Sequence, residues 1–122
     1  MQRFPIITLG TAFACIGAPA AFAHAFLDRA VPAVGSTVQG SPGEIRLVFS
    51  EAIVPAFAGV QIATAEGAPV EAGKPAIDAA NPAVLHVLLG HPLRPGVYKV
   101  TWHVVAVDTH RTEGSYIFTV MP

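Results

Sequence analysis

Thiol side chains are nearly absent from this sequence of 122 residues. The only cysteine, Cys15, lies close to the N-terminus, so the chain beyond it has no internal disulfide bond and no thiolate ligand. A metal ion held by that part of the chain must therefore be bound by nitrogen and oxygen donors.

Long hydrophobic runs and basic clusters are missing too. The apolar run from Phe4 to about Ala18 is shorter than the roughly 18–20 residues that a membrane-spanning helix needs. Beyond Arg3 the chain has six basic residues against eight acidic ones and no basic stripe, which argues against nucleic acid as a partner. We therefore expect a soluble, exported protein with no membrane span in its mature form.

The first 23 residues are typical of a secretory signal peptide. Arg3 supplies a positive start, an apolar run follows, and Ala21–Ala23 forms a small-x-small cleavage site. Cleavage after Ala23 leaves a single domain, residues 24–122, which begins with His24 and is long enough for one hydrophobic core.

Cys15 leaves a second interpretation open, in which a lipoprotein is cleaved just before this residue. The preceding Ala12–Ala14 lacks the usual Leu three positions upstream and puts the bulky Phe13 at the second position. Both features disfavour lipidation. In a lipidated chain His24 would carry no free amine.

Short stretches of alternating apolar and polar residues, separated by Pro and Gly, indicate β-strands after the signal peptide. Residues 70–82 are rich in Ala, Pro and Gly and are expected to form a loop, apart from a short strand near Val70. The longest strand is expected at Val97–Val107. The expected strands are Ala25–Val31, Glu44–Phe49, Val60–Ile62, a short one near Val70, Val84–Leu89, Val97–Val107 and Ser115–Val120.

About seven short strands with little helix predict an all-β fold. The expected architecture is a Greek-key antiparallel β-barrel or sandwich, similar to an immunoglobulin domain. Its core should contain Phe49, Trp102 and Phe118.

One residue at the start of the mature chain and two close to its end together suggest a metal site. An N-terminal His24 would offer its α-amine and its ring Nδ1, which can close a chelate ring on one ion. Asp108 and His110, two residues apart, would project to the same side of an extended strand. Three nitrogens and one oxygen in a plane suit Cu(II) or Ni(II), and Cu(II) binds more strongly. An Asp-x-His pair alone is more often a solvated surface pair, so its coincidence with the N-terminal histidine favours the metal site.

A series of segments occurs in a characteristic order over nearly the whole mature domain: His24, Pro32–Ser36, Ile45–Glu51, Pro92–Tyr98, Trp102–His110 and Gly114–Val120. With this series the chain resembles the CopC family of periplasmic copper-binding (copper resistance) proteins. The resemblance implies a Greek-key β fold, a periplasmic location and one Cu(II) ion per chain, bound by His24, Asp108 and His110. Some family members also have a methionine-rich loop for Cu(I). Because Met121 is the only methionine here beyond Met1, we expect a Cu(II) site alone.

Other candidate residues have weaker support. Glu51 matches a family glutamate near the copper and is expected to orient the His24 amine or to bind weakly at an axial position, with a plain strand-end carboxylate as the alternative. His103 has the opposite parity to Asp108 and should face away from the site, unless a β-bulge reverses it. His86 and His91 are expected to be structural or solvated.

Protein donors would fill most positions around the copper, which favours a carrier or buffer for copper homeostasis and resistance over an enzyme. The resemblance implies delivery to an inner-membrane copper transporter of the CopD type. Two alternatives stay open. One is a copper oxidase or oxygenase of the histidine-brace type, against which an in-plane Asp108 argues, and the other is a structural sandwich without metal.

Overall fold

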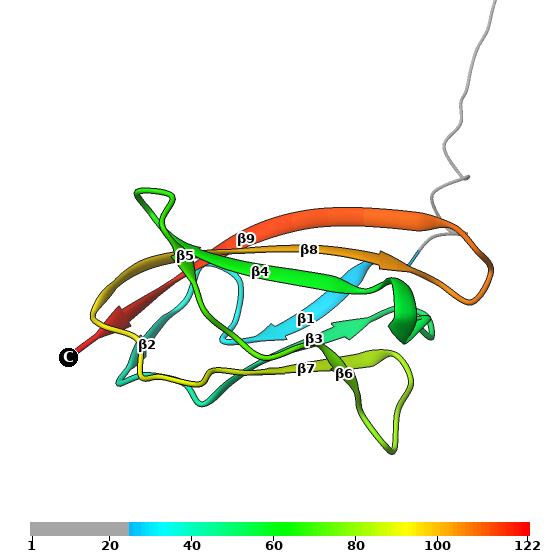
Figure 1. Cartoon of the computed structure of the whole chain (residues 1–122), viewed down its shortest axis with the longest axis horizontal. Helices are drawn as coiled ribbons and strands as arrows, with labels where there is room; N and C mark the ends of the chain where they lie inside the picture. Colours follow the sequence, from blue (N-terminus) through cyan, green and yellow to red (C-terminus); the bar gives the residue numbers. More distant parts are fainter. Residues whose placement is uncertain (1–24) are drawn as a thin grey trace, which may run out of the picture.

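A computed structural model describes residues 25–122, and both His24 and the expected signal peptide lie outside the described residues. The described chain forms two β-sheets packed face to face (Figure 1). The first sheet has the strand order β1-β3-β7-β6 and the second has the order β2-β9-β8-β4-β5. The strands are β1 (Leu27–Val31), β2 (Thr37–Gln39), β3 (Glu44–Phe49), β4 (Gly59–Thr64), β5 (Pro69–Val70), β6 (Ala76–Ile77), β7 (Val84–Leu88), β8 (Gly96–Val105) and β9 (Arg111–Met121).

All of these strands pair antiparallel except β2, which runs parallel to β9. A short 3-10 helix, η2 (Pro55–Phe57), precedes β4. No helix within residues 25–122 is long and apolar enough to cross a membrane. The all-β sandwich expected from the sequence is confirmed.

Several strand boundaries differ from the expectation. The last strand begins at Arg111 and not at Ser115, and β8 ends at Val105, so β9 is longer than β8. The inward positions at the start of β9 hold Thr112 and Gly114, which give no apolar alternation, and pairing with β8 makes this stretch a strand. The short β2 and β6 were not expected, and β6 lies in the segment that was predicted to be loop.

Alternation explains the strands that the sequence predicts well. Every second residue of β3 is buried, and the inward face of β8 carries Tyr98, Val100, Trp102 and Val104. The ring of Trp102 packs edge-on against Phe49 of the opposite sheet, with centroids 5.1 Å apart. Phe118 on β9 is fully buried and stacks on Tyr98. The Trp102–Phe49 contact joins the two sheets, and the Tyr98–Phe118 stack links two neighbouring strands of the second sheet. All three residues of the predicted core are buried.

Candidate metal site

The hairpin between β8 and β9 carries the predicted Asp108 and His110 at one end of the sandwich, opposite the C-terminus (Figure 1). Two backbone hydrogen bonds close its turn: His110 C=O accepts from Ala106 N–H at 3.0 Å, and Ala106 C=O accepts from Thr109 N–H at 2.8 Å. Thr109, between the two candidate ligands, has φ 74°, which is the left-handed region. The turn therefore bends sharply between Asp108 and His110.

The expectation that these two side chains share a side of an extended strand is wrong, because the residues belong to this turn. They still meet. Asp108 Oδ2 lies 3.2 Å from His110 Nδ1, and Asp108 Oδ1 accepts a hydrogen bond from the His110 backbone N–H at 3.1 Å. The left-handed Thr109 folds the chain back on itself, so the pair is brought together by the turn and not by strand periodicity.

The start of the described chain is anchored beside this hairpin. Ala25 is fully buried, and its carbonyl accepts a hydrogen bond from Thr112 Oγ1 at 2.8 Å. Thr112 is the second residue of β9 and lies two positions after His110. Ala25, which directly follows the predicted N-terminal histidine, is thus fixed next to the first residues of β9, close to the turn that carries Asp108 and His110.

A third segment, around Glu51, reaches the same end of the molecule. Ser50 accepts a hydrogen bond from Phe26 N–H at its hydroxyl and donates its own N–H to Phe26 C=O, each at 2.8 Å. Ala52 C=O accepts from Val107 N–H in the hairpin at 3.1 Å. Glu51 stands between these two anchored residues and is half-buried, so its backbone lies between the chain start and the hairpin.

Neither Ser50 nor Thr112 stands out in the sequence as part of a site. Thr112 shares inward parity with Tyr116 and Phe118, which is the one sequence feature that hints at its packing. Its partner Ala25 is 87 positions away, and no local pattern encodes such a pair.

His103 lies on the outer face of β8, as its parity predicts. It stands opposite Gly59 of β4, and its imidazole ring covers that glycine so closely that a Cβ there would overlap the ring. Within residues 25–122 no three His, Cys, Asp or Glu side chains form a group that could hold a metal ion.

His86 has a structural role that spacing did not reveal. Its Nε2 lies 2.7 Å from Asp78 Oδ1 and its Nδ1 lies 3.0 Å from Glu44 Oε1. The hydrogen bond to Asp78, reinforced by Glu44, raises the pKa of His86 above its usual value. The same bond lowers the pKa of Asp78. Since both ring nitrogens face carboxylates, this cluster is an ion-pair clamp, in line with the expected structural role.

The fold is a two-sheet β-sandwich in which the first described residues and the β8–β9 hairpin meet at one end. Comparison with known families gives the class a name: residues 27–121 match the CopC domain, and the chain belongs to the CopC family.

Relatives in this family include copper resistance proteins. Over 125 aligned residues the chain is 34% identical to Copper resistance protein C of Pseudomonas syringae pv. tomato, covering 98% of each protein. It is 36% identical to Protein YobA of Escherichia coli K12 over 102 residues, covering 84% of this chain and 82% of that protein.

Solved structures of this family also match the fold of the chain. PcoC, a methionine-rich copper resistance protein from Escherichia coli, superposes with a TM-score of 0.73 at 35% identity over 80% of this chain and 99% of PcoC. CopC from Methylosinus trichosporium OB3b superposes with a TM-score of 0.75 at 33% identity over 81% of this chain and 95% of that one. The resemblance read from the sequence segments is therefore confirmed.

Proposed function

We propose that this protein binds one Cu(II) ion at the hairpin end of the sandwich and buffers or carries copper in the periplasm for copper resistance. The observation that supports this most directly is the anchoring of Ala25 beside β9 through Thr112. Cleavage after Ala23 would create an α-amine on His24, one peptide bond from that fixed point. The amine and Nδ1 of His24 would join Asp108 and His110 as ligands.

The spacing of the described donors fits a shared ion. Two neighbouring ligands that each lie about 2.0–2.1 Å from a metal ion are separated by roughly 2.8–3.3 Å. Asp108 Oδ2 and His110 Nδ1 are 3.2 Å apart. A nitrogen-rich set with one carboxylate suits Cu(II). Glu51, held between the two neighbouring segments, would orient the amine or bind weakly at an axial position.

Proton competition would control copper capture and release. The ligands bind copper only when deprotonated, and reference pKa values are about 7.7–8.0 for an α-amine and about 6.5 for histidine. Affinity should therefore decrease steeply as the pH falls below 8. Protein donors in most planar positions would leave little room for a substrate, which favours transport over turnover. An inner-membrane transporter of the CopD type is the proposed recipient.

The decisive test changes only the position of the amine. We expect the protein beginning at His24 to bind one equivalent of Cu(II) tightly, and the same protein with one extra residue before His24 to bind at least about 100-fold more weakly, since the chelate is displaced. A competition titration against a Cu(II) chelator measures both affinities. Equal, tight binding by both proteins would refute the proposal.

A second test addresses the carboxylate. Asp108→Asn keeps an oxygen that can accept the His110 N–H but removes the negative charge, so we expect Cu(II) affinity to fall about 10–100-fold with the fold intact. Electron paramagnetic resonance of the copper-loaded variant should show an altered ligand set. Glu113→Gln, an exposed change on β9, is the matched control and should leave the affinity unchanged.

A further inference from the structure

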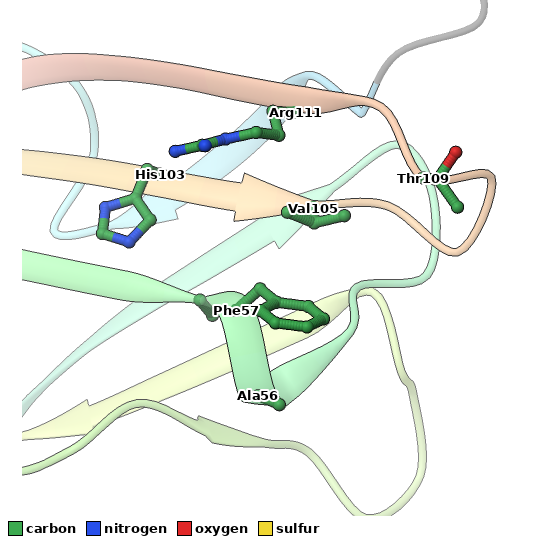
Figure 2. Close-up of a pocket in the computed structure, with 7 residues that line it drawn as sticks. Ala56, Phe57, His103, Val105, Thr109 and Arg111 are labelled. Atoms are coloured by element: carbon green, nitrogen blue, oxygen red, sulfur yellow. The ribbon is translucent and has the colours of Figure 1, made fainter.

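A hollow of about 510 Å³ lies on the outer face of the second sheet, next to the hairpin. Its size falls in the usual range for small-molecule sites. It is bounded by β8, by the start of β9 and by the η2 segment that leads into β4 (Figure 2). Its lining residues are Ala56, Phe57, Ala58, His103, Val105, Thr109 and Arg111.

Two nitrogen-bearing side chains, those of Arg111 and His103, lie along this hollow. Figure 2 shows the guanidinium group of Arg111 extended along the sheet toward the side where His103 lies. Neither side chain forms a hydrogen bond or ion pair within residues 25–122. Arginine stays protonated and offers several N–H donors in a plane. Since no carboxylate of residues 25–122 lines the hollow, its polar side is suited to an anion.

Apart from Thr109, the remaining lining residues are apolar. Phe57 projects from η2 with 61% of its surface exposed, an unusual exposure for a large aromatic ring. Val105, Ala56 and Ala58 complete this apolar side. Gly59 makes the arrangement possible, because any Cβ at that position would displace the His103 ring.

We propose that this hollow binds a small organic carboxylate with an apolar or aromatic body. The carboxylate would pair with Arg111 and accept a hydrogen bond from His103, while the apolar body packs on Phe57 and Val105. Charge-assisted hydrogen bonds to a guanidinium are among the stronger polar contacts, and an adjacent aromatic face adds affinity for a flat ligand. Thr109 lines the hollow between Asp108 and His110, so a bound carboxylate would lie beside the proposed copper ligands.

The test uses 3-phenylpropionate as the probe, with the purified protein free of metal. Nuclear magnetic resonance titration should show saturable shifts of the His103 and Phe57 ring signals, with a Kd in the millimolar range or below, on the order expected for a ligand of this size. The uncharged 3-phenylpropanamide should bind about tenfold more weakly. Acetate, which lacks the apolar body, should also bind about tenfold more weakly.

Substitutions in and beside the hollow test where the probe binds. Arg111→Gln and Phe57→Ala should each raise the Kd of the probe about tenfold, whereas Lys99→Gln should change this Kd less than about twofold. Lys99 is the matched control because it lies on the same strand as His103 but does not line the hollow. Equal binding of acid and amide, or an unchanged Kd in Arg111→Gln, would overturn the proposal, as would the lack of saturable binding. Because no copper is present, the outcome is independent of the proposed metal site.

Discussion

Thr109 is the residue on which the candidate site's geometry depends most. It is the only residue other than glycine with positive φ within residues 25–122. A β-branched side chain is disfavoured there, because its Cβ crowds the backbone. Its hydroxyl donates a hydrogen bond to the Asp108 carbonyl, which offsets part of that strain. The strained residue lies between the two candidate ligands.

We predict that Thr109→Gly leaves the protein about 1 kcal/mol more stable than Thr109→Val does, because both variants lose the hydroxyl bond and only glycine adopts positive φ without the steric penalty. Thr109→Val, which keeps the branched shape but loses the hydroxyl bond, should destabilise it by about 1 kcal/mol. Urea unfolding of the three proteins measures both changes. A glycine variant no more stable than the valine variant would show that the turn is not strained at this position.

At the scale of elements, the clamp around His86 ties three parts of the first sheet together. His86 lies on β7, Glu44 begins β3, and Asp78 directly follows β6. The two-residue β6 has few backbone pairs of its own, since it meets β7 only at Ala76 and Ile77. The side-chain clamp therefore adds a second connection between this short strand and the sheet.

The clamp should make stability depend on pH in a defined direction. The raised pKa of His86 contributes stability in full below about pH 6.5, and this contribution is lost as the pH rises through the folded-state pKa. The lowered pKa of Asp78 contributes stability above about pH 3.9, and this is lost as the pH falls through its folded-state value. The clamp should therefore be strongest between about pH 4 and pH 6.5.

We predict that His86→Gln lowers Tm most near pH 5.5 and clearly less at pH 9. Thermal unfolding followed by circular dichroism across this range gives the difference. His91→Gln is the control. The ion pair of His91 with Glu71 is long, at 3.8 Å, and both side chains are largely exposed, so it should contribute little to stability. A Tm difference for His86→Gln that stays constant or grows with pH would contradict the clamp.

For the whole molecule, Trp102 connects both sheets. Its ring meets Phe49 of β3 on one side, and Gly114 of β9 lies so close that a Cβ there would be 2.7 Å from the ring. The ring is buried and packs against Phe49 of the opposite sheet, so it has little room to move away from a larger residue. Packing between the sheets therefore requires glycine at position 114.

We predict that Gly114→Ala destabilises the protein by about 1–3 kcal/mol through overpacking. Gly43→Ala is the matched control, since its Cβ would meet nothing within 4 Å and its φ is not positive, and it should be nearly neutral. Unfolding can be followed by the fluorescence of Trp102, the one tryptophan of the chain. Equal stability of the two variants would show that the Trp102 ring can yield.

The sequence by itself determined the β class, the family and the inward faces of β3, β8 and the second half of β9. Side-chain alternation and the residues of each family segment can be read directly along the chain. The sequence could not reveal β2 and β6, whose two or three residues are strands only because neighbouring strands pair with them.

The tertiary structure alone decided which distant groups meet. It joined Ala25 to Thr112 across 87 positions and His86 to Glu44 across 42. It also brought Asp108 to His110 through a turn with one left-handed residue, where the sequence had suggested a strand. Such contacts depend on which distant strands pair, on how the two sheets stack and on the turn that closes a hairpin, and none of these is a property of any short stretch of residues.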